Sequence, residues 1–178
     1  MHKEILSFWF DEIKPSQWWK KDSNFDQLII DRFSTVHSQA NHCELYTWRQ
    51  TALGRLAEII VLDQFSRNMF RGSPLSFASD ALALALAQEA VTQGADMELD
   101  PQQRGFLYTP YMHSESADIH AYALSLYQER GTEGGFDFEL KHKRIIDRFG
   151  RYPHRNIVLG RESTQEELDF LKEANSSF

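Results

Sequence analysis

Cysteine is almost absent from this chain: Cys43 is the only one among 178 residues. A single cysteine can form no intrachain disulfide and cannot build a Cys-based zinc site. Its scarcity favours a reducing compartment, because small secreted proteins commonly depend on disulfides. We therefore expect a cytoplasmic protein.

Hydrophobic runs of membrane length are also missing. The apolar run over residues 5–10 stops at Asp11, which is too short for the core of a secretory signal. No stretch approaches the roughly 18 apolar residues that a membrane-spanning helix needs. The aromatic rings at residues 8–10 and 18–19 could anchor at a membrane interface, but core packing is the usual fate of such rings. We predict no membrane partner.

Positive charge is scarce overall but concentrated in one segment. The net charge of −7 argues against non-specific binding to nucleic acid or anionic lipid, so we expect no nucleic-acid partner. Residues 141–161, however, hold seven basic residues and one acid, so this window carries +6 and the rest of the chain −13. This asymmetry predicts either a local anion site or internal ion pairs with the acidic remainder.

Strand patterns are nearly absent, whereas helix patterns recur along the whole chain. Hydrophobic residues make up 42% and aromatic residues 13% of the chain, enough for one well-buried core. The length suits a single domain over residues 1–178. We therefore predict an all-α domain with seven to eight helices, joined by short loops and stacked as antiparallel hairpins.

Capping residues, glycine and proline mark the expected helix boundaries. We expect helix starts at Asp22 or Ser23, at a Thr47–Gln50 capping box, at Asp100, at Ser114, near Asp137 and at a Ser163–Glu166 capping box. We expect helix ends near Gly72 and Gly94, before Pro110, at Gly131, and at Arg148 with Gly150 behind it.

The helix expected after position 47 ends its apolar face in polar residues. Its stripe continues into Asp63 and Arg67, and the neighbouring row continues into Gln64 and Asn68. Asp63 and Arg67 have the i, i+4 spacing of a salt bridge, and Arg71 extends the row by one turn. Because unpaired buried charge is costly, these groups need further partners. The pattern predicts either an ion-pair network between helices or a polar pocket at the end of a helical groove.

Two histidines are candidates for chemistry. His113 stands in an expected turn that displays its side chain, next to Glu115, whose charge suits a helix start. His142 lies on an apolar helix face, which predicts a hydrogen-bonded core residue or else an acid/base or ligand. Glu139 with His142 has the spacing of half a carboxylate-bridged di-metal site, but no second copy exists. We therefore predict no metal and no cofactor.

The basic segment contains the most prominent polar patch. Gly150 can end the preceding helix and Pro153 is expected to stop a restart, which predicts a fixed, extended loop. In and beside this loop are Arg148, Arg151, His154, Arg155, Asn156 and Arg161. Guanidinium groups bind phosphate or carboxylate bidentately, so the loop is a candidate anion cradle. Alternatively, its arginines bind helix carbonyls and acids such as Asp63, and lock the loop in place.

These polar motifs also carry a family resemblance. Residues 63–72, 77–80, 110–115 and 148–161, together with His142 and Ser163-Thr164, resemble in the same order the bacterial domain of unknown function 924. The resemblance covers nearly the whole chain. It implies a tetratricopeptide-like fold of helical hairpins and no established activity. Ser66 stands where the family commonly has proline, and His120 where it usually has glutamine.

Two functions are consistent with these patterns. The first is binding of a small molecule or anion, which includes an enzyme acting on a phosphorylated or carboxylated compound, because acidic, basic and imidazole groups converge on faces that packing alone does not need. No nucleophile motif and no phosphate-binding glycine loop is present, so the sequence names no reaction. The second is a tetratricopeptide-like scaffold that binds a peptide in a concave groove. The oligomeric state is left open.

Overall fold

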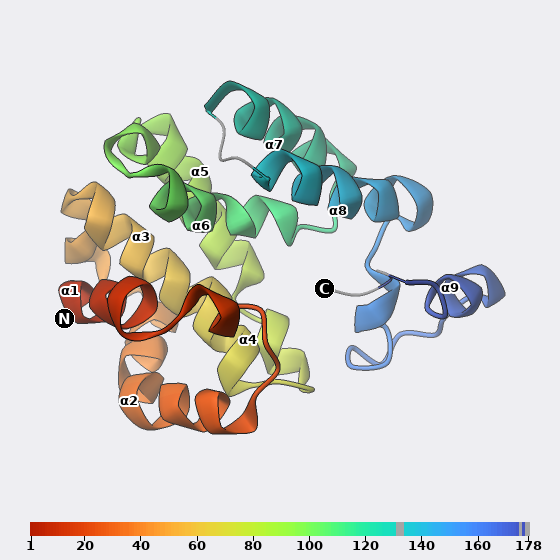
Figure 1. Cartoon of the computed structure of the whole chain (residues 1–178), viewed down its shortest axis with the longest axis horizontal. Coiled ribbons are helices and arrows are strands. Elements are labelled where there is room, and N and C mark those ends of the chain that lie inside the picture. Colours follow the sequence, from red (N-terminus) through yellow and green to blue (C-terminus); the bar gives the residue numbers. More distant parts are fainter. Residues whose placement is uncertain (131–133, 175, 177–178) are drawn as a thin grey trace.

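The computed structural model describes residues 1–130, 134–174 and 176. All regular elements among these residues are helical, which confirms the predicted all-α class (Figure 1). The α-helices are α1 (His2–Ser7), α2 (Ser23–Asn41), α3 (Ala52–Ile60), α4 (Ser66–Met69), α5 (Asp80–Thr92), α6 (Pro101–Met112), α7 (Ala117–Arg130), α8 (Gly135–Phe149) and α9 (Gln165–Phe170). Short 3-10 helices lie at Pro15–Gln17, Tyr46–Gln50, Pro74–Phe77, Ala95–Glu98 and Pro153–Arg155, and π-turns at Phe8–Glu12 and Val61–Phe65.

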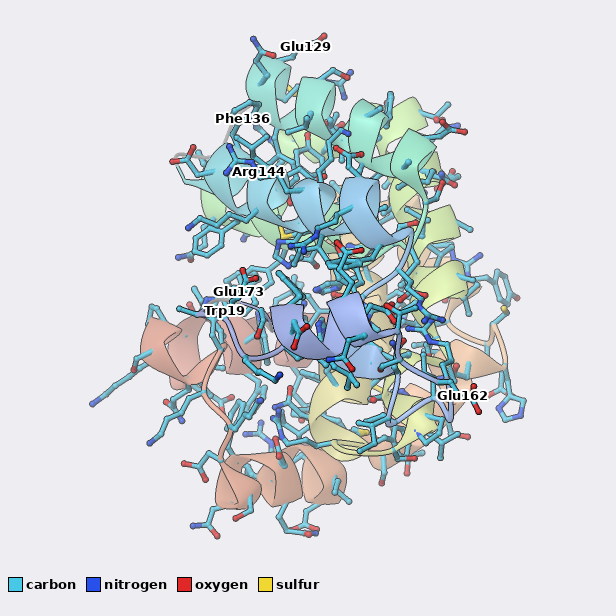
Figure 2. All side chains as sticks on the ribbon, turned by 90° about the vertical axis from the view of Figure 1, so that its right-hand side faces the viewer. Trp19, Glu129, Phe136, Arg144, Glu162 and Glu173 are labelled. Carbon is cyan, nitrogen blue, oxygen red and sulfur yellow. The ribbon has the colours of Figure 1, made fainter. Side chains whose placement is uncertain are left out.

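The helices pack mainly against neighbours that are close in sequence. α1 packs on α3, α2 packs on α4, and α3 contacts both α5 and α6. Beyond them α6 packs on α7 and α7 packs on α8, so the chain in Figure 1 runs from α1 and α2 at one end to α7 and α8 at the other. In the turned view of Figure 2, α9 lies below α8, and Glu162 marks the loop that leads into α9. The tetratricopeptide-like description of this order stays a prediction.

An aromatic core fills the space between the N-terminal helices. Phe33 contacts Phe8 and Phe65, with ring centroids 4.9 and 5.0 Å apart. Trp9 is fully buried and its ring meets the edge of Phe106 on α6 at 5.7 Å. Burial of each such ring contributes roughly 1.5–3 kcal/mol, so this cluster holds α1, α2 and α6 around the continuous segment from α3 to α4. The core thereby fixes the segment that carries Asp63 and Arg67.

A π-turn explains how the apolar stripe of α3 gives way to buried polar residues. All five residues of Val61–Phe65 are buried, including Asp63 and Gln64. A π-turn shifts the following residues around the helix axis relative to a regular α-helix, and such turns are frequent at functional sites. Ser66, at the position where the family commonly has proline, donates its hydroxyl to the Leu62 carbonyl at 2.6 Å. The hydroxyl therefore supplies a donor where the helix returns from π to α geometry.

Several predicted boundaries are confirmed. α2 begins at Ser23, and the Asp22 carboxylate accepts from the backbone N–H groups of Asn24 and Phe25 at 3.0 and 3.3 Å. α8 ends at Phe149, and Gly150 takes the left-handed conformation with φ of 68°. The predicted helix end at Gly131 lies outside the described residues.

Two capping boxes were predicted at the wrong residues. Tyr46–Gln50 is a 3-10 helix, and α3 begins only at Ala52, where the Thr51 hydroxyl accepts from the Gly54 N–H at 3.1 Å. The backbone of the 3-10 helix comes so close to Gly54 that a Cβ there would lie 2.0 Å from the Trp48 carbonyl oxygen, which explains the glycine. The last capping box is one residue later than predicted.

In that last box, Thr164 accepts from the Glu167 N–H at 3.2 Å, and the Glu167 carboxylate accepts from the Thr164 N–H at 2.8 Å. The predicted start at Ser114 is also too early. Its hydroxyl accepts from the Ser116 N–H at 3.2 Å, and α7 begins at Ala117. Ser and Thr residues adjacent in sequence compete for one capping role, and the tertiary contacts of the preceding loop decide between them.

The two proline predictions are wrong for identifiable reasons. α6 continues through Pro110, which leaves the Phe106 carbonyl without its usual donor, but the Thr109 hydroxyl lies 2.8 Å from that oxygen. Pro153 does not keep the following loop extended. It opens the 3-10 helix Pro153–Arg155, because its fixed φ suits the first position of a helical turn.

Among the described residues no helix is both long and apolar enough to cross a membrane.

Candidate functional site

An open hollow of about 430 Å³ lies between the start of α5, the end of α6 and the loop after Tyr152. Phe77, Leu84, Pro110 and Leu159 form its apolar wall, and Asp80, His113, Ser114, Glu115 and Arg155 contribute polar groups. Asp80 and Leu84 share one face of α5, and Pro110 and His113 share one face of α6, since residues three and four apart are neighbours on a helix. A second cavity of about 300 Å³ beside Lys14, Lys20 and Asp22 contains none of the predicted site residues.

Asp63 holds one side of the His113 ring. Its carboxylate is fully buried, and Oδ1 lies 2.7 Å from His113 Nδ1 and 3.1 Å from an Arg67 nitrogen. Oδ2 accepts from the Gln64 amide at 2.6 Å and lies 2.9 Å from the Thr109 hydroxyl. Burial raises the pKa of Asp63, but the charges of Arg67 and His113 and its hydrogen bonds outweigh burial and hold it well below its usual range. Asp63 is therefore ionised.

His113 is thereby fixed in one tautomer. An ionised carboxylate only accepts, so the Nδ1 of His113 carries the proton and Nε2 is the acceptor of the neutral ring. Burial, together with the charge of Arg67, lowers the pKa of His113 despite the opposing effect of Asp63. Within the described part of the chain, no group forms a hydrogen bond with Nε2, and the residue lines the hollow. His113 can therefore accept a proton from a bound molecule.

Arg67 connects this pair to α5. Its two terminal nitrogens bind both oxygens of Asp80, at 2.9 and 3.0 Å, and one of them also donates to the Asp63 carbonyl at 2.8 Å. Bidentate geometry and the additional backbone bond are what make a largely buried ion pair tolerable. Asp80 stands in the first turn of α5, where the helix dipole also favours a negative charge.

Arg155 enters the same cluster from the basic loop. Its guanidinium packs on the rings of Phe77 and Tyr152, 4.6 Å from each centroid, and its side chain is 7% exposed. One terminal nitrogen donates to the His113 carbonyl at 3.0 Å, and the other reaches Asp80 only at 3.4 Å. Its Nε is buried and has no hydrogen-bond partner among the described residues. Burial and the charge of Arg67 lower the pKa of Arg155, which shows how incompletely its charge is compensated.

Glu115 and Arg161 anchor the loop to the rim of the hollow. Arg161 binds both carboxylate oxygens of Glu115, at 2.7 and 3.0 Å, and Glu115 also accepts from the Tyr152 N–H at 2.8 Å. Asn156 accepts from Arg161 at 3.0 Å and donates to Ser163 at 3.0 Å. This half of the loop matches the alternative in which arginines lock it in place.

Tyr152 is surrounded by three histidines. Its ring centroid lies 6.3, 5.9 and 5.4 Å from those of His120, His142 and His154. Its hydroxyl donates to the Met112 carbonyl at 2.6 Å, which joins the loop to the end of α6. Burial lowers the pKa of His142 to about 3 and that of His154 to about 4, so both rings are neutral at pH 7.

His120 replaces the glutamine usual in the family and makes two buried contacts. Its Nδ1 lies 2.5 Å from the Glu139 carboxylate and its Nε2 lies 2.8 Å from the Ser114 carbonyl. Histidine and glutamine at position 120 can both donate a hydrogen bond to the Ser114 carbonyl. Glu139 thus pairs with His120, and within the described ranges no group of three or more His, Cys, Asp and Glu side chains could hold a metal ion.

The structure brings some predicted site residues together and separates others. Asp63, Gln64, Arg67, His113 and Arg155 are joined by direct hydrogen bonds or ion pairs, with Glu115, Asn156 and Arg161 at the rim and His142 and His154 around Tyr152. The remaining four bind carboxylates outside this cluster. Asn68 and Arg71 bind Asp26 on α2, Arg148 binds Glu166, and Arg151 binds Glu167.

Asp80, Tyr152, Thr109 and Phe77 were not predicted as site residues. The segment 77–80 belongs to the family resemblance, so a signal for Asp80 and Phe77 was present in the sequence. Thr109 directly precedes Pro110, and a hydroxyl residue before a helical proline is a pattern that could have identified its role. Nothing in the local sequence marks Tyr152 as the residue on which the histidines converge.

Comparisons with known proteins agree with one another. The sequence profile of the family described as "Bacterial protein of unknown function (DUF924)" matches residues 5–175. A solved structure, the protein of unknown function ATU0120 from Agrobacterium tumefaciens, is 38% identical, covers 97% of each chain and superposes with a TM-score of 0.91. No curated protein matches the chain. The chain therefore belongs to the DUF924 family of bacterial proteins of unknown function.

Proposed function

We propose that this protein binds a small anionic molecule in the hollow between α5, α6 and the loop after Tyr152. The observation that carries the proposal is the Asp63–His113 pair. It presents a neutral imidazole, in a fixed tautomer, to an open space of about 430 Å³. Sites for small ligands are typically concave and largely apolar, with a few converging polar groups, and the hollow has this character.

Arg155 supplies the positive charge of the site. The two carboxylates of the lining are already matched, because Asp80 receives two bonds from Arg67 and Glu115 receives two from Arg161. Arg155 makes one hydrogen bond to a backbone carbonyl and a 3.4 Å contact to Asp80. The charged group with hydrogen-bonding capacity left at the wall is therefore a cation, which favours an anionic group on the ligand.

If the protein transforms its ligand, acid–base chemistry at His113 is the step that the geometry supports. A carboxylate that holds Nδ1 keeps the ring oriented and stabilises it when Nε2 takes up a proton. No described serine, threonine or cysteine side chain forms a hydrogen bond with His113, so the site has no activated nucleophile of that kind. The alternative of a peptide-binding scaffold has no specific observation in its favour among the described contacts.

A thermal-shift screen with carboxylates and phosphate esters tests the proposal. A ligand present at 100 times its dissociation constant stabilises the folded state by about 2.7 kcal/mol. We expect stabilisation of the parent protein and its loss in Arg155→Met. The matched control is Arg148→Met, because Arg148 forms an exposed ion pair with Glu166 outside the hollow. Equal stabilisation of both variants would place the ligand elsewhere and contradict the proposal.

A further inference from the structure

We infer that the ligand is an organic monocarboxylate with an apolar body, and that its binding places a proton on His113 Nε2. This inference rests on the proposed function and specifies the chemistry of the same hollow. It is carried by the donor capacity that remains at Arg155, by the fixed tautomer of His113 and by the apolar residues that line the same hollow.

The polar groups of the lining suit one carboxylate. Among the described contacts, the terminal nitrogens of Arg155 make one hydrogen bond to the His113 carbonyl and a contact of 3.4 Å with Asp80, so they have donor capacity left. A carboxylate is planar and offers two acceptor oxygens to the edge of a guanidinium. The rings of Phe77 and Tyr152 each pack 4.6 Å from the guanidinium, so we expect a ligand to meet it at its edge.

The same wall disfavours a phosphate ester. A phosphate monoester carries a charge of about −1.5 to −2 at pH 7 and three strong acceptor oxygens. Asp80 and Glu115 also line the hollow, and their carboxylates would repel a second negative charge. One guanidinium and one imidazole cannot supply the hydrogen bonds that the three acceptor oxygens of a phosphate need. A singly charged anion is therefore the better match.

The apolar residues of the lining select an apolar body. Phe77, Leu84, Pro110 and Leu159 offer carbon surface and no side-chain hydrogen-bond donor or acceptor. Burial of ligand carbon against them contributes about 25 cal/mol per Å² of apolar surface. A short aliphatic chain or a single aromatic ring attached to the carboxylate fits a lining that combines such carbon surface with a few polar groups.

The proton on His113 follows from the tautomer. With Nδ1–H donated to Asp63, Nε2 of the neutral ring is an acceptor, and a carboxylate is an acceptor too. The two repel each other unless a proton from solvent binds Nε2, after which the imidazolium lies between two carboxylates. The charged and titratable groups around the ring are Asp63, Arg67, Asp80, Glu115, Arg155, His142 and His154. Without a ligand, these groups together favour the neutral form of the His113 ring. The negative charge of a bound carboxylate reverses this preference and favours the protonated form.

Calorimetric titration in two buffers of different ionisation enthalpy tests both the carboxylate class of the ligand and the uptake of a proton by His113. The probes are benzoate, phenylacetate, hexanoate and octanoate, with benzamide as the neutral analogue and phenyl phosphate as the dianionic one. We expect at least one carboxylate to bind at least tenfold more tightly than benzamide and phenyl phosphate. We also expect an uptake of between half a proton and one proton at pH 7.5, and affinity that falls as pH rises further.

Two variants assign the result to the hollow. His113→Gln keeps an amide donor for Asp63 and is expected to abolish proton uptake, whereas Arg155→Lys keeps the charge and is expected to weaken carboxylate binding at least tenfold. Carboxylate binding without proton uptake would overturn the protonation. Tighter binding of phenyl phosphate, lost in Arg155→Lys, would overturn the carboxylate class and leave the proposed function intact. If the binding of no probe depends on Arg155 or His113, both the proposed function and this inference are wrong.

Discussion

The carboxylate of Asp63 and the imidazole of His113, fifty residues apart in the chain, meet at 2.7 Å between Oδ1 and Nδ1. Asp63 reaches this position from a buried π-turn, and His113 from the C-cap position directly after α6. The pair thus couples the interior of the helical stack to the hollow at its surface.

Asp63→Asn is expected to destabilise the protein by about 3–5 kcal/mol, because it leaves the largely buried Arg67 with only Asp80 as a charged partner. Urea denaturation followed by circular dichroism measures the change. Asp147→Asn is the matched control, since Asp147 forms an exposed pair with Lys143 and should cost less than about 1 kcal/mol. Similar losses for both variants would show that the buried network does not depend on Asp63.

Thr109→Val removes a hydroxyl at nearly constant volume. The hydroxyl lies near both the Phe106 carbonyl and Asp63, and its one proton serves one of them at a time. Leaving such buried acceptors without a donor costs about 1–3 kcal/mol. The control is Thr92→Val on the exposed end of α5, where the hydroxyl bonds the Gln88 carbonyl, and a change below about 0.5 kcal/mol is expected. An unchanged free energy of unfolding for Thr109→Val would refute its role at the helical proline.

Tyr152→Phe is expected to loosen the loop that forms one wall of the hollow. The variant loses the 2.6 Å bond to the Met112 carbonyl and leaves that buried oxygen without this donor, at a cost of about 1–3 kcal/mol. Hydrogen exchange of the backbone amides in residues 152–161 should accelerate. Tyr122→Phe on α7, where the tyrosine is 48% exposed, should leave exchange unchanged. Protection equal to that of the parent would contradict the anchoring role.

The free energy of unfolding is expected to fall as pH decreases below about 6.5. Burial lowers the pKa of His142 to about 3 and that of His154 to about 4, so between these values and 6.5 the unfolded chain binds more protons than the folded one. Each such histidine then reduces stability by about 1.4 kcal/mol per pH unit as the solution is acidified. Denaturation at pH 7.5, 6, 5 and 4.5 measures the slope.

His142→Gln should make that slope shallower, because one buried histidine no longer takes up a proton on unfolding. His42→Gln provides the control, since His42 lies on the surface at the end of α2. A stability that rises toward acid pH in the parent would contradict the assignment of neutral buried histidines.

The periodicity of the sequence was sufficient for the helical class and for the inward direction of Asp63 and His142. It was not sufficient for the partners of the arginines. Arg155 meets Asp80 across 75 residues, and such pairings follow from tertiary packing that local spacing does not encode. The π-turn escaped prediction as well, because the local sequence of Val61–Phe65 carries no pattern that distinguishes a π-turn from a regular α-helix. The sequence leaves an anion cradle and a loop lock as alternatives. Arg161 and Arg155 both make contacts of the lock, to Glu115 and to the His113 carbonyl, and Arg155 also lines the hollow, where anion binding stays a proposal.

The protonation state of His113, followed by proton–nitrogen NMR correlation of its ring with and without a saturating carboxylate, tests the central claim most directly. We expect a neutral ring protonated at Nδ1 in the free protein, and a ring protonated at both nitrogens when the ligand is bound. Arg155→Met should abolish this change. A free ring protonated at Nε2 instead, or a ring whose signals do not respond while a ligand binds, would show that His113 does not have the proposed role.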